Sequence, residues 1–98
     1  MKMVVGRFSP RKEANFFSQA RKTDLPGLKI FLKHIVYDEL RYAISVQAGG
    51  AVERNAIKRE VKTWLYEHKE QLKNKKIFII VLQWNKAKLE IDKISNLV

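Results

Sequence analysis

Five side chains that could bind a polyanion lie in one short stretch near the middle of the chain. They are Arg54, Asn55, Lys58, Arg59 and Lys62. An arginine guanidinium can grip two phosphate oxygens, a lysine ammonium adds a mobile point charge, and an asparagine amide can donate to and accept from a base edge or a ribose hydroxyl. This combination favours RNA as the ligand. The alternative is a solvated basic face without a partner.

The apolar residues around this stretch predict the element that carries it. They are Ile57, Val61, Trp64, Leu65, His68 and Leu72. Their recurrence at intervals of three and four is typical of one buried side of a helix, which we expect to run from Ala51 to Lys73. At about 100° per residue, the basic residues fall on an adjacent side. The helix would therefore pack with one face and present cations with the other.

The position of the basic residues within this predicted helix is unusual. They occupy its first turns, where the helix dipole is positive and free backbone N–H groups favour an anion. Helix stability alone would place Asp or Glu there, and only Glu53 and Glu60 follow that rule. Because the rule is broken in the direction that phosphate binding requires, we predict that this helix is the RNA-binding surface.

The composition agrees with a folded, basic RNA-binding protein. The chain has 98 residues, of which 46% are hydrophobic, enough for one domain spanning residues 1–98 with a modest core. Twenty Lys and Arg against ten Asp and Glu give a net charge of +10. So much charge on a small surface creates a positive potential of several kT, which favours a polyanionic partner.

Other classes of site find little support in the sequence. There is no cysteine, and His34 and His68 are isolated, so neither a disulfide framework nor a zinc site is expected. No nucleophile stands with a base, so we expect no catalytic residue and no small-molecule substrate. The N-terminus lacks a secretory signal pattern and the longest apolar run, Ile77–Leu82, is too short to cross a bilayer. We therefore expect a cytoplasmic protein without a membrane partner.

Pro and Gly residues divide the first half of the chain into expected elements. The breaks fall at Pro10, at Pro26–Gly27 and at Gly49–Gly50. We expect a first helix over Lys12–Lys22 and a half-buried strand over Leu28–Tyr37. A tight turn at residues 38–39 would then lead into a second strand over residues 41–46, hydrogen-bonded antiparallel to the first.

The second half of the chain predicts the topology. The apolar, β-branched run Ile77–Trp84 is typical of a central strand buried on both faces. A long helix between two neighbouring strands implies a βαβ crossover and hence a mixed sheet. Residues 86–98 could form a short terminal helix. The expected fold is an α/β (α+β) sandwich with element order α-β-β-α-β-α.

Two adjacent segments carry a family resemblance. The strand Ala43–Val46 and the helix start Ala51–Arg59 resemble the bacterial ribonuclease P protein component, whose members carry a strand of the type G-[IL]-S-V, a Lys- and Gly-containing loop, and a helix opening A-V-x-R-N-R-x-K-R. The expected element order also looks like that family's fold. The resemblance implies a ribosomal protein S5 domain 2-like fold in which the crossover has the unusual left hand.

Three departures from the family pattern predict fewer RNA contacts, as in a divergent, short member. Ala56 stands where the family has the second Arg of its R-N-R signature. The loop Gln47–Gly50 is two residues shorter than usual and lacks the paired lysines. The region before the first strand and the terminal helix are also short. Glu53 further reduces the positive charge of the site.

The resemblance also implies roles for individual residues. Arg54, Asn55, Lys58 and Arg59 match the helix that approaches the catalytic RNA. A cleft between the first helix and the sheet would hold the single-stranded 5′ leader of precursor tRNA. The candidate cleft residues are Asn15, Phe16 and Phe31, where aromatic rings beside cations suit single-strand binding. The alternative for the two phenylalanines is simple core packing.

The function implied is a non-catalytic protein subunit of the ribonucleoprotein endoribonuclease ribonuclease P, in tRNA 5′-end maturation. Its partners would be ribonuclease P RNA and precursor tRNA. The RNA with bound Mg²⁺ would carry out the hydrolysis, and the protein alone would bind no cofactor. The alternative is a ribosomal-protein-like or general RNA-binding domain that kept the fold only. A protein-only nuclease is disfavoured because Asp24, Asp38 and Asp92 are scattered.

Overall fold

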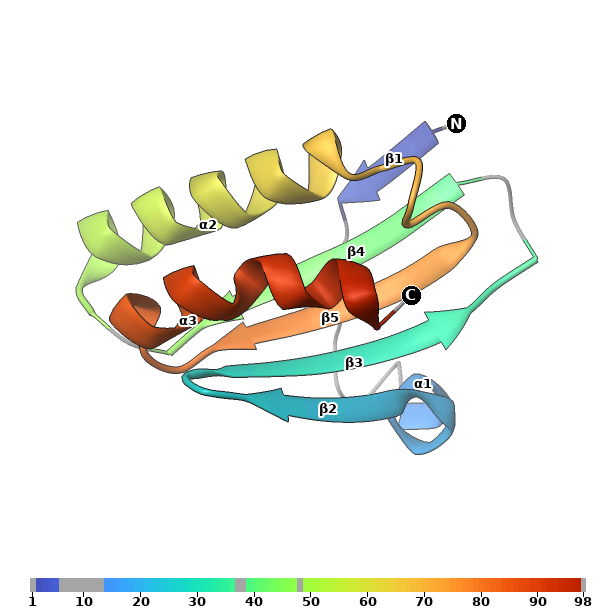
Figure 1. Cartoon of the computed structure of the whole chain (residues 1–98), viewed down its shortest axis with the longest axis horizontal. Helices are drawn as coiled ribbons and strands as arrows, with labels where there is room; N and C mark the ends of the chain where they lie inside the picture. The colour runs from blue at the N-terminus through green and yellow to red at the C-terminus, as the bar shows by residue number, and fades with distance from the viewer. Residues whose placement is uncertain (1, 6–13, 37–38, 48, 98) are drawn as a thin grey trace.

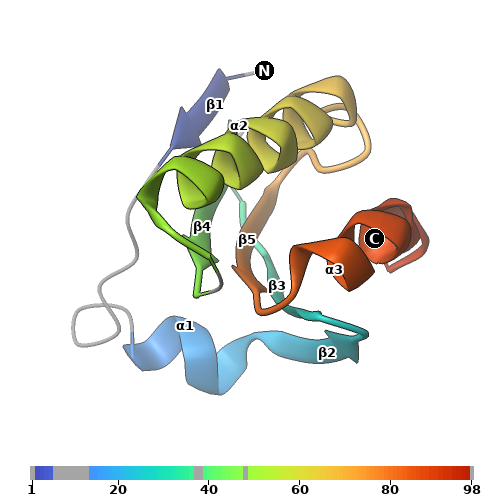
Figure 2. The same ribbon diagram turned by 90° about the vertical axis from the view of Figure 1, so that its left-hand side faces the viewer.

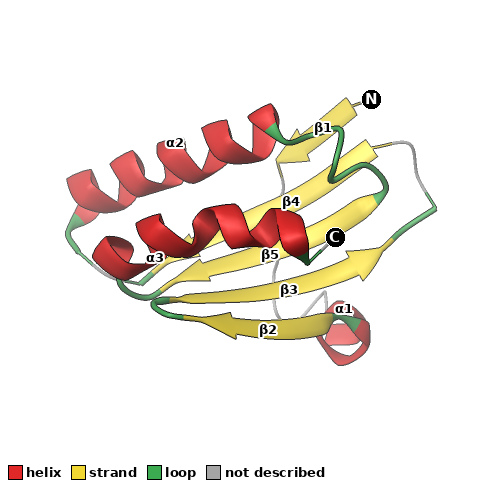
Figure 3. Cartoon of the chain, in the orientation of Figure 1, coloured by secondary structure: helices red, strands yellow, loops and turns green. Residues whose placement is uncertain are grey.

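The computed structural model describes residues 2–5, 14–36, 39–47 and 49–97, which form one five-stranded sheet covered by helices (Figures 1 and 3). Along the chain the elements are β1 (Lys2–Val5), α1 (Ala14–Gln19), β2 (Arg21–Leu25), β3 (Leu28–His34), β4 (Glu39–Val46), α2 (Ala51–Glu67), β5 (Lys75–Val81), α3 (Trp84–Glu90) and the 3-10 helix η1 (Ile91–Asn96). Across the sheet the strand order is β1-β4-β5-β3-β2. None of the described helices has the length and apolar character needed to cross a membrane.

The sheet is mixed, as predicted. Strand β4 runs parallel to both β1 and β5, whereas β3 runs antiparallel to β5 and β2. Helices α2 and α3 cover one face, and α1 lies against the other (Figure 2). When β4 and β5 point upward and α2 faces the viewer, β5 lies to the left of β4 (Figures 1 and 2). The β4–α2–β5 crossover is therefore left-handed, the rare hand for such a connection.

The main core lies between the sheet and the two helices α2 and α3. Alternate residues of the strands point into it, among them Ile30, Tyr42 and Ile79. Helix α2 contributes side chains at intervals of three and four, namely Ile57, Val61, Trp64 and Leu65. The Trp64 indole also donates a hydrogen bond of 2.7 Å to Asp92 Oδ1, which ties α2 to η1.

The predicted fold class, the long helix, the central strand and the βαβ crossover are confirmed. The pairing predicted for the strands over residues 28–37 and 41–46 is wrong. Strand β5 lies between β3 and β4, and β4 makes its hydrogen bonds with β5 and β1. The reason is that β5 is apolar on both faces, so it takes the central position where both faces are covered.

The predicted first helix over residues 12–22 is also partly wrong. Only Ala14–Gln19 is helical, residues 12 and 13 lie outside the described part, and the chain from Arg21 forms β2. The Pro26–Gly27 turn, with Gly27 at a φ of +72°, connects β2 to β3, and all of β2 pairs with β3. Ladder hydrogen bonds and the packing of Leu25 against the core outweigh weak helix propensity. Neither β1 nor β2 was expected from the sequence.

Several predicted boundaries also move. The central strand β5 spans Lys75–Val81 rather than Ile77–Trp84. Strand β3 ends at His34, and residues 37 and 38 of the predicted strand and turn lie outside the described part. Helix α2 ends at Glu67 rather than Lys73, because turns carry the fully buried Leu72 into the core and Asn74 adopts a left-handed φ of 59° before β5. The terminal helix begins earlier than predicted, at Trp84, and continues as η1.

Candidate nucleic-acid interface

Three basic residues form a row along the exposed side of α2. Arg54, Lys58 and Lys62 are four residues apart, so they lie about 6 Å from one another along the helix axis. All three are exposed, and no ion pair or hydrogen bond engages their side chains within the described part of the chain. We call these three residues the cationic row. Asn55 and Arg59 are exposed beside it.

The cationic row opposes the stability of the helix that carries it. Like charges four residues apart on a helix destabilise it by roughly 0.2–0.5 kcal/mol per pair. The row contains two such pairs, Arg54 with Lys58 and Lys58 with Lys62. Burial of Ile57, Val61 and the other core residues of α2 holds the helix in place despite this repulsion. A polyanion bound along the row would remove the repulsion.

The first turn of α2 is less positive than its dipole alone would make it. The helix begins after Gly50, which has no side chain that could cap the free N–H groups. The Glu53 side chain lies directly against Gly49, whose φ of +86° favours glycine. The Glu53 carboxylate therefore stands in the first turn of α2, where the backbone N–H groups are free. Ala56 is exposed and adds no charge.

A second surface with aromatic and basic side chains lies on the sheet face that carries α1. We call it the open face, because among the described residues only the short helix α1 packs there (Figure 2). Strand register places Lys22, Phe31, Phe78 and Ala43 side by side across four strands. The neighbouring row consists of Lys33, Lys76 and Arg41. A strip of rings and a strip of cations thus run next to each other.

Four phenylalanines form a cluster on the open face. The Phe17 ring stands edge-on to Phe31 and Phe78, at centroid distances of 5.1 Å and 5.4 Å. Phe16 contacts Phe17 at 5.3 Å, and the Lys76 ammonium lies 5.4 Å from the centroid of the Phe16 ring. Phe17 and Phe31 are half-buried, so part of each ring faces solvent.

The structure distributes the predicted cleft residues unequally. Asn15 is exposed on α1, and Phe31 stands at the centre of the open face. Phe16, however, is only 3% exposed, so its ring packs in the core and offers almost no surface to a base. Sequence reasoning missed Phe78 and the lysines of the open face. Alternation within Leu28–His34 could have indicated Lys29 and Lys33, but Lys76 and Arg41 are placed beside them only by the strand register.

No cluster of metal-binding side chains appears in the described part of the chain. No three side chains of the metal-binding types His, Cys, Asp and Glu come together there, so these residues do not form a cation site. The pKa of Tyr42 is raised by burial, but this residue lies in the core.

Comparison with known proteins identifies a matching family. The sequence model of the family described as Ribonuclease P matches residues 10–96 of the chain. A search of the curated proteins found no match.

Solved structures share the fold at low sequence identity. A Staphylococcus aureus RNase P protein superposes with a TM-score of 0.71 at 22% identity, covering 98% of this chain and 99% of that one. The RNase P protein from Thermotoga maritima gives 0.72 at 21% identity, with 94% of each chain covered. A Staphylococcus aureus RNase P protein mutant with defective mRNA degradation activity gives 0.70 at 23%, covering 96% of this chain and 79% of that one.

Proposed function

Because this chain belongs to the ribonuclease P protein family, whose members are protein subunits of ribonuclease P, we propose that it binds the catalytic RNA and the 5′ leader of precursor tRNA in the cytoplasm. In this proposal the two RNA ligands use different surfaces. The cationic row of α2, with Asn55 and Arg59, binds ribonuclease P RNA. The open face of the sheet binds the single-stranded leader.

The observation that carries the proposal is the cationic row. Three exposed cations at four-residue spacing repel one another, and the fold keeps them in a row along a helix whose other side is in the core. Neutralising phosphates releases counterions from RNA, which is the main source of affinity for a protein with a net charge of +10. Asn55 adds a group that can hydrogen-bond to a base edge or a 2′-hydroxyl.

The open face has the two components that single-stranded RNA needs. Base stacking on an exposed ring contributes about 1–3 kcal/mol per base without requiring a particular sequence. The half-buried Phe31 offers part of such a ring, while Lys33, Lys76 and Arg41 form a cationic strip for the backbone beside it. This face lies on the other side of the sheet from α2, so leader and catalytic RNA can be bound together (Figure 2).

The proposed contribution of the protein to the reaction is binding and charge neutralisation. In this proposal the RNA holds the Mg²⁺ ions and carries out phosphodiester hydrolysis. The chain holds the leader against the open face and places cations near converging phosphates, which lowers the Mg²⁺ concentration that the reaction needs.

Reconstitution with a bacterial ribonuclease P RNA tests the proposal. Cleavage of precursor tRNA at low Mg²⁺ should be stimulated by the protein, and more strongly for a substrate with a 5′ leader of several nucleotides than for one with a single-nucleotide leader. The matched control is the double variant Arg54→Ala/Lys58→Ala, which should lose most of the stimulation while remaining folded. Absence of stimulation by the wild-type protein would contradict the proposal.

A general RNA-binding domain is the second candidate, and the neutral, exposed Ala56 favours it. Such a domain would bind structured RNA tightly and with strong salt dependence, because the cationic row would still contact phosphates. It would show no preference for a substrate with a leader. The leader-length comparison in the reconstitution assay therefore separates the two candidates.

A further inference from the structure

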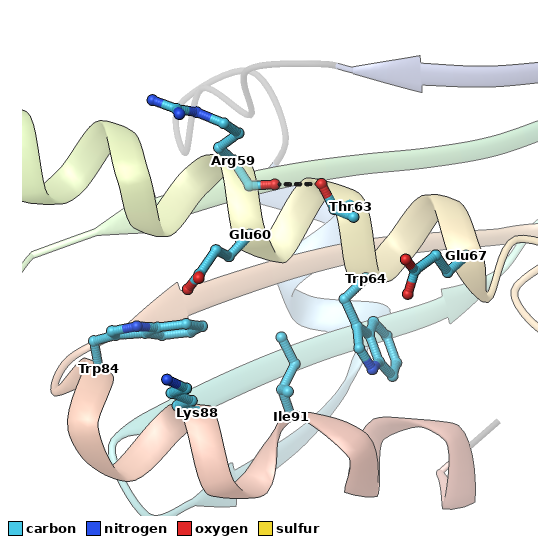
Figure 4. A pocket seen from close by; sticks show the side chains of 8 residues that line it. All are labelled: Arg59, Glu60, Thr63, Trp64, Glu67, Trp84, Lys88 and Ile91. Carbon is cyan, nitrogen blue, oxygen red and sulfur yellow. Dashed lines mark hydrogen bonds between the residues drawn. The ribbon is translucent and has the colours of Figure 1, made fainter.

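A groove with an apolar floor runs between α2 and α3 (Figure 4). It consists of two neighbouring hollows of about 350 Å³ and about 370 Å³, which share Glu60 and Trp84 as lining residues. Ile57, Trp64 and Ile91 complete most of the apolar lining. No described element of the chain fills this groove. It is separate from the open face, which lies on the other side of the sheet.

The border of the groove on α2 is acidic. Glu53, Glu60 and Glu67 all line it and follow one another at seven-residue intervals, which places them on one side of the helix. The cationic row lies on a different side of α2. Arg59 and Lys88 also line one of the hollows, but in Figure 4 Arg59 points away from α3 while Glu60 extends toward it. The row of glutamates along α2 therefore suits a cation beside an apolar side chain, although Lys88 lines the opposite wall of one hollow.

The chain itself presents such a side chain on the outer surface of α3. Leu89 is 78% exposed, and it is one of the large hydrophobic side chains that the described part of the chain leaves at the surface. Lys86 lies three residues before it and Lys93 four residues after it, so both flank Leu89 along the outer side of α3 and η1. Lys93 pairs with Glu90 on the same surface, whereas no interaction holds the Lys86 ammonium within the described residues. We call Lys86, Leu89 and Lys93 the α3 ridge.

From this complementarity we propose that the groove is occupied by the α3 ridge of a second copy of the chain. Leu89 of one copy enters the hollow above Trp84 of the other, and Lys86 approaches the acidic border at Glu60. Because α3 supplies both the ridge and one wall of the groove, a two-fold axis lets each copy insert its ridge into the groove of the other. The contact is therefore isologous and closes as a dimer.

The dimer would leave the cationic row and the open face free, whereas Arg59 lies at the edge of one of the hollows. The cationic row projects from the side of α2 that does not line the groove, and the open face is covered by neither α2 nor α3. Each dimer would thus carry two such surfaces, which permits bivalent binding of RNA. Self-association of the free protein does not depend on the proposed role in ribonuclease P, so either inference can fail without the other.

Sedimentation equilibrium of the free protein tests the inference. Measurements extend to about 0.5 mM protein, because small interfaces associate weakly. They are made at about 0.15 M salt, where the net repulsion between two basic chains is screened beyond roughly 8 Å. We expect a monomer–dimer equilibrium for the wild type and at least a tenfold weaker dimer for Leu89→Lys. The matched control is Val36→Lys, which makes the same charge change at a residue that is 95% exposed and far from the groove, and it should dimerise like the wild type.

A charge exchange identifies the contacting surfaces. Glu60→Lys and Lys86→Glu should each weaken the homodimer, and an equimolar mixture of the two should form more dimer than either variant alone. A wild-type chain that stays monomeric throughout the concentration range would overturn the inference. So would equal dimerisation of Leu89→Lys and Val36→Lys, or a mixture that associates no better than its components.

Discussion

The two faces of the sheet are built from the same strands but contain different kinds of side chain. On the face under α2 and α3, residues such as Ile30 and Ile79 are at most 1% exposed and form a continuous apolar core. On the open face, their neighbours in sequence include the half-buried Phe31 and Ile80 and a strip of cations. Because successive strand residues point to opposite faces, one strand can serve stability on one side and binding on the other. Substitutions at adjacent positions should therefore have different consequences.

The largest effect is expected from Ile79→Ala. This side chain is completely buried in the centre of the closed face, and removing it leaves a cavity that should cost about 2–5 kcal/mol of unfolding free energy. Ile80→Ala, the next residue on the same strand, is the matched control and should cost clearly less because Ile80 is half-buried on the open face. Urea denaturation of both variants measures the difference. Equal losses would show that the two faces contribute alike to stability.

The next largest effect concerns the open face. Phe31→Ala should weaken binding of a short single-stranded RNA by about 1–3 kcal/mol, because one stacking platform is lost. Phe31→Tyr keeps the ring and should bind nearly as well as the wild type. Fluorescence anisotropy with a labelled oligonucleotide gives both affinities. If Phe31→Ala binds as tightly as Phe31→Tyr, the aromatic cluster serves only the packing of α1.

A smaller effect is expected in the salt dependence of RNA binding, which should change for variants of α2 but not for cations elsewhere on the surface. Arg54→Ala and Lys58→Ala should each weaken binding to ribonuclease P RNA and reduce the slope of log K against log salt by about one unit. Lys88→Ala, an exposed cation on α3, should leave the slope unchanged. Titrations at several salt concentrations measure the slopes. An unchanged slope in the α2 variants would relocate the RNA surface.

The smallest effect is expected at Tyr42, on the closed face. Its hydroxyl is buried and has no hydrogen-bond partner among the described residues. Tyr42→Phe should therefore leave the unfolding free energy unchanged or raise it by about 1 kcal/mol, since an unsatisfied polar group is removed. Thermal denaturation near neutral pH measures the change. A clear loss of stability would mean that the hydroxyl has a partner after all.

The same residue gives a pH dependence. Burial raises the pKa of Tyr42 above its usual value of 10.0, so the folded chain holds this proton more tightly than the unfolded chain. The resulting contribution to stability is complete below pH 10 and is lost as the pH rises above it, because the unfolded state then binds fewer protons. Tyr42→Phe should lack this part of the alkaline loss. The unfolding free energy of both proteins is measured from pH 8 upward. The difference between wild type and variant isolates the effect of Tyr42, because the lysines titrate in both.

The sequence by itself determined the elements whose pattern is strongly periodic and the side chains of the candidate α2 site. Apolar residues at intervals of three and four define the buried side of α2, so the polar residues on its other sides must be exposed. The apolar run beginning at Ile77 likewise had to be a central strand. For these elements the pattern along the chain already contains the burial, so the spacing of Arg54, Lys58 and Lys62 alone is enough to identify them as exposed cations.

Only the tertiary structure decided how the strands are ordered and which side chains meet on the open face. Short segments such as Arg21–Leu25 have no preference strong enough to outweigh the hydrogen bonds of a neighbouring strand, so β2 became visible only through its pairing with β3. The insertion of β5 between β3 and β4 brings Phe78 against Phe31 and Lys76 against Lys33. These residues are more than forty positions apart, and their contact depends on register, which is fixed by packing of the whole sheet and not by any local pattern.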